Sequence, residues 1–127
     1  NFLSMANVLI CLLPLTSKTK DILNQNTFLK LPQGAYVINV GRGPHLVDED
    51  LLQALDSGHL AGACLDVFRE EPLPPDHPFW SHPKVFVTPH ISSITDPVSV
   101  APQVIENYNR ARSGAPLLYA VELEREY

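Results

Sequence analysis

The sequence predicts an α/β fold, namely the C-terminal half of a doubly wound parallel sheet with a long closing helix. Three observations support this prediction: apolar strand-like runs alternate with helical patterns, Gly and Pro residues separate them, and the longest helical pattern comes last. Such alternation indicates βαβ units with right-handed crossovers. Half of such a sheet has an apolar edge, which we expect to need a partner.

The first half of the chain predicts two strands joined by short helical segments. Pro14 ends a continuous apolar run, which is typical of a strand covered on both faces. Thr16 or Ser17 is a suitable N-cap for the polar segment that follows. The expected elements are a strand over residues 6–13, a short helical turn over 16–23, a short helix over 26–31 and a strand over 35–40.

The second half predicts two helices and two further strands. Acidic residues at positions 48–50 favour the dipole of a helix start, and Gly58 ends that helix. Gly114 caps the last helix, in which Pro102 fits only in the first turn. The expected elements are a helix starting at Asp48, a strand over 60–67, a proline-rich loop over 70–83, a strand over 84–88 and a helix over 98–113.

The composition predicts a globular domain that binds neither nucleic acid nor membrane. The chain has 127 residues, of which 45% are hydrophobic and 18% are charged, so it can bury a core. Its net charge is −5 and no basic run occurs, which argues against nucleic acid or an anionic membrane as a partner. The longest apolar stretch is too short to cross a bilayer.

The two cysteines, Cys11 and Cys64, lie inside apolar strand-like runs. We expect two reduced, buried thiols in a cytoplasmic protein, with a disulfide between adjacent strands as the alternative. No zinc-type spacing occurs, so no metal site is expected. The chain begins at Asn1 without a Met, and strand-like sequence follows almost at once. We therefore expect a piece of a longer protein whose remaining strands precede Asn1.

Arg42, Glu71 and His90 are the candidate catalytic residues. Each lies at or just past the end of a strand-like stretch, and in an open α/β sheet those ends converge on one crevice where ligands bind. A cation that binds a carboxylate, an imidazole that donates a proton and a carboxylate that tunes the imidazole suit reduction of a 2-keto acid. The alternatives are a loop histidine, a solvated Glu70–Glu71 pair and a surface arginine.

The glycines beside Arg42 favour its functional interpretation, because they let the backbone approach a ligand closely. The segment does not form a dinucleotide fingerprint, G-x-G-x-x-G, since Leu46 stands where the third glycine would be. The other four histidines are expected to be surface or loop groups, namely His45, His59, His77 and His82.

Three blocks of sequence together resemble the D-isomer-specific 2-hydroxyacid dehydrogenases. They are residues 12–16 (LLPLT), residues 31–43 (LPQGAYVINVGRG) followed by Val47-Asp48, and residues 65–74 (LDVFREEPLP) with the later Thr88-Pro89-His90. Within that family, His45, residues 74–80, Ile94-Thr95 and Tyr127 make the chain most similar to bacterial glyoxylate/hydroxypyruvate reductases of the A type.

The resemblance implies a Rossmann-like NAD(P)-binding domain, with residues 1–114 as its C-terminal part and 115–127 as a tail returning toward a substrate domain. It implies that His90 is the general acid/base, that Glu71 is its partner and that Arg42 binds the substrate carboxylate. It implies NADP or NAD as cofactor, contacted by Pro14, Leu15, Thr16, Val40, Gly41, Arg42, Asp66, His90 and Ser92. It also implies a homodimer of the full-length protein.

Two of these roles have structural alternatives. Asp66 contacts the nicotinamide carboxamide by resemblance, but a carboxylate that caps a loop amide is an equal interpretation. Trp80 either shapes the substrate pocket or anchors its own loop.

The predicted activity is hydride transfer from NAD(P)H to a small 2-keto acid such as glyoxylate or hydroxypyruvate, with the isolated chain incomplete for catalysis. Two alternatives remain open: a non-catalytic nicotinamide-binding scaffold similar to a corepressor, and an inactive structural fragment. Neither the choice between NAD and NADP nor the particular 2-keto acid follows from these residues.

Overall fold

The computed structural model describes residues 2–121 and 124, and the chain divides into two compact units, residues 1–92 and 93–127. The division falls before the position 114 that the sequence predicts as the end of the cofactor domain, and the predicted tail 115–127 lies partly outside the described residues, as does Tyr127. No helix in the described part is long and apolar enough to span a bilayer.

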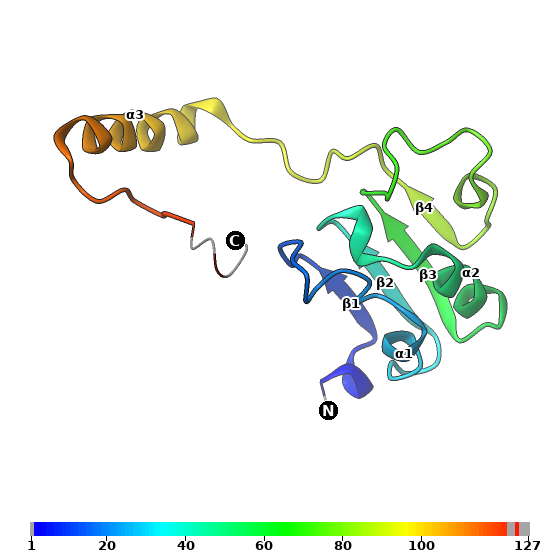
Figure 1. Ribbon diagram of the computed structural model, residues 1–127. Helices are drawn as coiled ribbons and strands as arrows, with labels where there is room; N and C mark the ends of the chain where they lie inside the picture. Colours follow the sequence, from blue (N-terminus) through cyan, green and yellow to red (C-terminus); the bar gives the residue numbers. More distant parts are fainter. Residues whose placement is uncertain (1, 122–123, 125–127) are drawn as a thin grey trace. The chain divides into compact units, whose positions relative to one another are not determined.

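The first unit is built on four parallel strands, as the sequence predicts, and their order in the sheet is β1-β2-β3-β4 (Figure 1). The strands span Val8–Cys11 (β1), Ala35–Asn39 (β2), Leu60–Leu65 (β3) and Val85–Val87 (β4). They are shorter than predicted. Pairing between β1 and β2 ends at the Cys11–Asn39 pair, so the apolar residues Leu12 and Leu13 continue as exposed loop.

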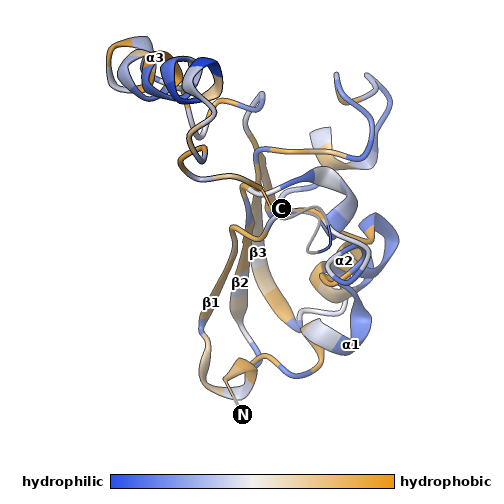
Figure 2. Ribbon diagram, turned by 60° about the vertical axis from the view of Figure 1, so that its left-hand side comes forward, coloured by the Kyte–Doolittle hydropathy of each residue, from blue (hydrophilic) through white to orange (hydrophobic). Residues whose placement is uncertain are grey.

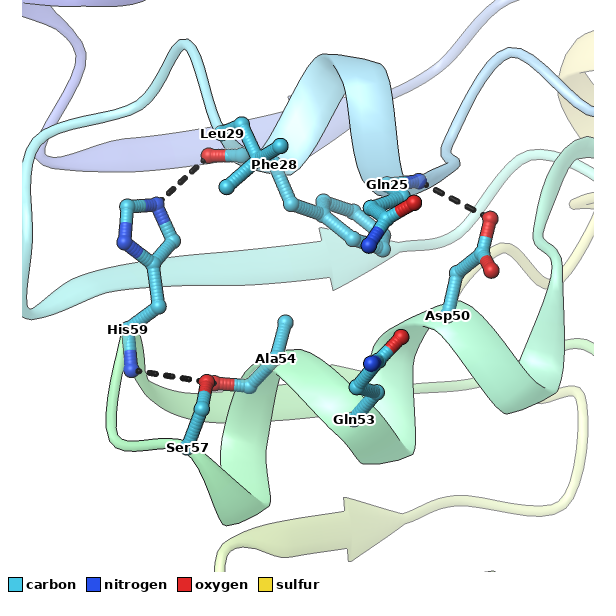
Figure 3. A pocket seen from close by; sticks show the side chains of 8 residues that line it. All are labelled: Gln25, Phe28, Leu29, Asp50, Gln53, Ala54, Ser57 and His59. Atoms are coloured by element: carbon cyan, nitrogen blue, oxygen red, sulfur yellow. Dashed lines mark hydrogen bonds between the residues drawn. The ribbon is translucent and has the colours of Figure 1, made fainter.

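Two helices cover one face of this sheet: α1 (Gln25–Phe28) and α2 (Asp48–Asp56) (Figure 2). Asn24 caps α1 by accepting the N–H of Thr27, and Asp50 of α2 accepts the N–H of Gln25 at 2.9 Å (Figure 3). The side chain of His59 makes a further tie, from Nε2 to the carbonyl of Phe28 at 2.8 Å. These polar contacts hold the two helices beside each other at the edge of the apolar core.

The predicted short helical turn over residues 16–23 is present as a single turn, in which the N–H of Lys20 donates to the carbonyl of Thr16 at 3.0 Å, and it does not extend into a helix. Thr16 still acts as a local cap, since its hydroxyl accepts the N–H groups of Lys18 and Thr19 at 3.2 Å. The second predicted short helix exists but begins and ends earlier, at Gln25 and Phe28.

The core lies between the sheet and the two helices. Leu9, Val37, Leu51 and Leu65 are among its buried side chains. Alternate residues of the strands point to the other face, where Tyr36 and other apolar side chains are exposed. Within residues 2–92 the first strand is therefore covered on one face and not on both as predicted, because α1 and α2 lie on the same side of the sheet. Cys11 is buried and Cys64 is partly exposed, and both are free thiols.

The described residues of the second unit include one long helix, α3 (Pro97–Ser113). Asp96 caps its start by accepting the N–H groups of Val98 and Ser99, and Gly114 ends it in the left-handed conformation with φ of 71°. The prediction that Pro102 fits only in the first turn is wrong, because it lies inside the helix. Every residue of this part of α3 is exposed, so water can replace the hydrogen bond that proline removes.

Candidate active site

The loops that follow the four strands gather at one edge of the sheet, where ligands bind in open α/β folds (Figure 1). These loops carry every residue that the sequence predicts for the site. β1 leads into Pro14–Thr16, β2 into Val40–Arg42, β3 into Asp66 and Glu71, and β4 into His90 and Ser92. Parallel pairing therefore brings segments far apart in the sequence to the same edge.

His90 and Glu71 form a direct pair. Nδ1 of His90 lies 2.7 Å from Oε2 of Glu71, and the other carboxylate oxygen accepts the N–H of Phe68 at 2.9 Å. The hydrogen bond from His90 lowers the pKa of Glu71 against the opposing effect of desolvation, and the Phe68 N–H and the charges of His90 and Arg42 lower it further. Glu71 thus stays ionised, and because Nδ1 is engaged, Nε2 is the nitrogen left for a substrate.

Asp66 fixes the loop that presents His90. Its carboxylate is 1% exposed and accepts the Thr88 hydroxyl and the N–H groups of Ile91 and Ser92, both at 2.9 Å. His90 itself has φ of 53°, a left-handed conformation that costs free energy in a residue other than glycine. The hydrogen bonds from the N–H groups of Ile91 and Ser92 to Asp66 hold the backbone in this conformation.

Burial raises the pKa of Asp66, but the hydrogen bonds from Thr88, Ser92 and Ile91 outweigh it and lower the pKa to about 2. The structure therefore displays the loop-capping role that the sequence offered as one of two interpretations. With three hydrogen bonds on a buried carboxylate, Asp66 acts through the loop it holds.

Arg42 has a fixed backbone and an exposed side chain. Its N–H donates to Nδ1 of His45 at 3.1 Å, and its carbonyl accepts Nδ2 of Asn39 at 3.2 Å. The guanidinium donates to the carbonyl of Gly41 at 2.7 Å. Within the described residues it forms no ion pair, although its charge acts on Glu71. Its planar fork is therefore available for a carboxylate.

The glycines beside Arg42 are needed for packing against protein. A Cβ on Gly43 would lie 1.8 Å from the carbonyl oxygen of Phe68, and a Cβ on Gly41 would lie 3.0 Å from Nδ1 of His45. Contacts within the protein thus explain both glycines, and the expectation that they also let the backbone approach a ligand stays a prediction. Their small size lets the loop after β2 pack against the loop after β3, which brings Arg42 near Glu71.

The prediction that four histidines are surface or loop groups is wrong for His45, which is fully buried. Its ring bridges the N–H of Arg42 and the carbonyl of Pro14, which lies 3.3 Å from Nε2. His59, His77 and His82 are partly buried, and each contacts a named partner. Reasoning from sequence used His45 only as a mark of resemblance and missed its structural role. It missed Asn39 altogether, whose only signal was a polar side chain at a strand end.

A cavity of about 450 Å³ adjoins the His90–Glu71 pair. Its other walls are mainly apolar, formed by Phe68, Pro72, Leu73, Trp80, Val87 and Pro89. Trp80 is 55% exposed and donates from Nε1 to the carbonyl of Pro74 at 2.9 Å, so it both lines this cavity and anchors its own loop. A small organic molecule can therefore reach the imidazole.

The expected cofactor contacts lie on the same edge. Pro14, Leu15 and Ser92 are exposed, and Thr16 and Val40 are partly exposed. Apolar Leu15 and the turn around it suit the flat rings of a dinucleotide. These residues thus fit part of a nicotinamide cofactor. In the part of the chain described, no group of His, Cys, Asp or Glu side chains is placed to bind a metal.

Comparison with known proteins places this edge in context. A sequence model described as "D-isomer specific 2-hydroxyacid dehydrogenase, NAD binding domain" matches residues 1–92. The chain is 44% identical to a D-isomer-specific 2-hydroxyacid dehydrogenase from Xanthobacter autotrophicus Py2, solved with NADPH and MES, with a TM-score of 0.95 over 99% of this chain and 52% of that one.

Two other solved structures are similar. An NADPH-dependent glyoxylate/hydroxypyruvate reductase from Sinorhizobium meliloti, solved with NADP and sulfate, is 41% identical, with a TM-score of 0.91 over 99% of this chain and 42% of that one. A family protein from Klebsiella pneumoniae 342 is 51% identical, with a TM-score of 0.89 over 95% of this chain and 39% of that one. This chain thus spans about half, or less, of the length of each.

Proposed function

We propose, because this chain belongs to the D-isomer-specific 2-hydroxyacid dehydrogenases, that the protein carrying it is an NAD(P)-dependent oxidoreductase that reduces a small 2-keto acid. Glyoxylate and hydroxypyruvate are the proposed substrates, since a similar reductase bears those names. The observation that carries the proposal is the 2.7 Å contact between His90 and Glu71 at the carboxyl edge of the sheet. It supplies an oriented proton donor beside a cavity.

In the proposed mechanism His90 is the general acid. Glu71 accepts a hydrogen bond from Nδ1–H and so directs Nε2 toward the keto oxygen of the substrate. The lowered pKa of Glu71 keeps this carboxylate charged, so it remains a hydrogen-bond acceptor for Nδ1 of His90. In the reverse direction the neutral imidazole takes the hydroxyl proton at the same nitrogen. Asp66 holds the backbone on which His90 is presented.

Arg42 binds the substrate carboxylate in this proposal. A guanidinium can donate two parallel hydrogen bonds to a carboxylate, which fixes orientation as well as affinity. The chain is acidic overall, with a net charge of −5, so attraction of an anion has to come from a local cation. Arg42, exposed beside the His90–Glu71 pair, supplies that charge.

A nicotinamide cofactor, when bound, supplies the hydride. We assign its contacts to the edge residues named above, Pro14–Thr16, Val40–Arg42, Asp66, His90 and Ser92, with Asp66 acting through the loop that it holds. Because similar proteins were solved with NADPH or NADP, we propose NADPH as the preferred form. We also assign residues 1–114 to the cofactor domain, 115–127 to a tail toward a substrate domain, and the full-length protein to a homodimer.

The test is a steady-state assay of the full-length protein with glyoxylate and NADPH. His90→Ala is expected to lower kcat by about 10²- to 10⁴-fold, which is the usual contribution of acid–base catalysis. Arg42→Lys keeps the charge but loses the fork, so KM for glyoxylate is expected to rise by about tenfold or more. His82→Ala is the matched control, because His82 also pairs with a carboxylate, Asp56, at 3.2 Å.

Three results would contradict the proposal. One is a wild-type protein that binds NADPH but turns over none of the small 2-keto acids, as expected of a scaffold. Another is an unchanged kcat in His90→Ala, and the third is an equal loss in His82→Ala. Titration of this chain with NADPH, followed by fluorescence, tests the remaining alternative of an inert structural fragment, which saturable binding would exclude.

A further inference from the structure

His45 is the last residue of a short 3-10 turn, Gly43–His45, and its side chain is completely buried. The ring contacts two different loops. Nδ1 accepts the N–H of Arg42 at 3.1 Å, and Nε2 lies 3.3 Å from the carbonyl oxygen of Pro14. Because Nδ1 accepts a hydrogen bond, the ring carries its N–H at Nε2, and this N–H donates a hydrogen bond to the carbonyl of Pro14. One imidazole thus joins the loop after β1 to the loop after β2.

Each contact fixes a part of the site. On one side, the N–H of Arg42 bonds to His45 while its carbonyl accepts from Asn39, so the peptide groups on both sides of this residue are held. On the other side, the carbonyl of Pro14 accepts both Nε2 of His45 and the hydroxyl of Thr19 at 2.7 Å. The Arg42 side depends more on His45, because nothing else in the described residues binds that N–H.

The ring has little freedom to move. A Cβ on Gly41 would lie 3.0 Å from Nδ1 of His45, 3.1 Å from Cε1 and 3.2 Å from the carbonyl of Leu13. The backbone carbonyl of His45 also accepts the N–H of Leu23 at 2.9 Å. The buried imidazole therefore lies against Gly41, with one nitrogen held by the N–H of Arg42 and the other by the carbonyl of Pro14.

We infer that His45 is a positioning residue that holds the carboxylate-binding Arg42 and the cofactor-binding turn Pro14–Thr16 in a single arrangement. The inference rests on the proposed function of those two segments. A buried polar side chain has a desolvation cost that packing alone would avoid by using an apolar residue. The two hydrogen bonds, one to each segment, are what the histidine adds over a leucine of similar volume.

Two substitutions separate the contacts, because Asn and Gln each keep one of them. His45→Asn retains an oxygen near the position of Nδ1, which can accept the Arg42 N–H, but it cannot reach Pro14. His45→Gln retains an amide near the position of Nε2, which can reach Pro14, but it leaves the Arg42 N–H without an acceptor. Comparing the two variants therefore shows which segment depends on Nδ1 and which depends on Nε2.

The experiment measures KM for glyoxylate, Kd for oxalate in the presence of NADP, and Kd for NADPH by fluorescence, all in the full-length protein. His45→Gln is expected to raise KM for glyoxylate and Kd for oxalate by about 5- to 100-fold, which is the range for a buried donor left unpaired. Kd for NADPH should stay nearly unchanged. His45→Asn is expected to raise Kd for NADPH by about 2- to 10-fold, which is a smaller effect because Thr19 still binds the carbonyl of Pro14. His59→Gln, which alters a similar tie to a backbone carbonyl, is expected to change none of these.

The same pattern in both His45 variants, or a matching loss in His59→Gln, would overturn the inference. If wild-type protein binds NADPH and oxalate without turnover, the proposed function fails while the two Kd values still test His45. If it binds neither, both fail. Should the His45 variants not fold, Gly41→Ala displaces the ring instead and is expected to weaken oxalate and NADPH together. Gly62→Ala, which crowds the Tyr36 ring at 3.1 Å, is its control, and equal effects would overturn the inference.

Discussion

Replacement of Asp66 by Asn tests whether the buried carboxylate holds the loop that carries His90. The substitution keeps one acceptor oxygen but places an NH₂ group opposite the N–H of Ser92. An NH₂ group cannot accept that hydrogen bond. Two backbone N–H groups bond to the ionised carboxylate at 2.9 Å. Loss of these charge-assisted bonds is expected to cost about 2–3 kcal/mol locally.

The measurement is hydrogen exchange of the peptide that contains Ile91 and Ser92 in the full-length protein. A local loss of about 2–3 kcal/mol corresponds to about 30- to 150-fold faster exchange of these two amides. The turnover number is expected to fall as well, because the left-handed conformation of His90, with φ of 53°, loses its support. KM for NADPH should change less than kcat if Asp66 acts through the loop.

The pH dependence gives a second, independent readout of the same carboxylate. The pKa of Asp66 falls from the ordinary 3.8 to about 2 in the folded protein, so its stabilisation is fully present above pH 3.8 and is lost as pH falls through 2. The Asp66→Asn protein should lack this acid-dependent loss.

The matched control is Asp96→Asn. Asp96 also binds two backbone N–H groups, those of Val98 and Ser99, but at an exposed helix start where Asn is an equally good cap. Equal exchange rates in Asp66→Asn and wild type, or an acid-dependent loss of the same size, would refute the reasoning.

Two further predictions concern the contacts beside Asp66. Glu71→Gln keeps an acceptor for Nδ1 of His90 but removes its charge, so kcat is expected to fall about tenfold. In wild type the ion pair is lost as pH falls through the lowered pKa of Glu71, which sets the acid limb of the pH–rate profile, and this limb should disappear in the variant. An unchanged profile would count against the pair. Gly43→Ala places a Cβ 1.8 Å from the carbonyl oxygen of Phe68 and is expected to destabilise the protein by about 3 kcal/mol or more in thermal unfolding. Gly62→Ala should be far milder, because its Cβ would lie 3.1 Å from the Tyr36 ring and 3.3 Å from the carbonyl oxygen of Lys84.

Much of the fold could be predicted because it depends on patterns within short stretches of sequence. Apolar runs ended by Pro or Gly located all four strands, and the parallel sheet and the family are both confirmed. Strand ends were less accurate, since pairing with a neighbour decides them. Leu12 and Leu13 continue an apolar run but extend beyond the last residue of β2 that could pair with them. Helix coverage of a face likewise depends on residues from elsewhere in the chain.

The candidate site could be predicted only in part. Motif context singled out Arg42, Glu71 and His90, and the structure pairs the last two, while their catalytic roles stay predictions. The environment of each group could not be predicted, because it is made by contacts across the sheet edge. His45 lies 31 positions from its partner Pro14, and its place near the Arg42-Gly43 pair did not reveal that its ring is buried.

The buried polar side chains show how this edge is kept rigid. In the described part of the first unit, the polar or charged residues that are fully buried are Asn39, His45 and Asp66. Asn39 ends β2 and Asp66 directly follows β3, and together with His45 they bind backbone groups of the loops that carry Arg42 and His90.

A buried polar group is costly unless every hydrogen bond is made, and none of the buried polar side-chain atoms in the described residues lacks a partner. The core elsewhere is apolar, so this cost is concentrated where side chains have to be held in one geometry. At all three positions the polar side chain binds backbone groups of these loops, and an apolar residue would remove those hydrogen bonds. The three buried side chains therefore hold the loops of Arg42 and His90 in one conformation, which is the rigidity that the proposed roles of these two residues require.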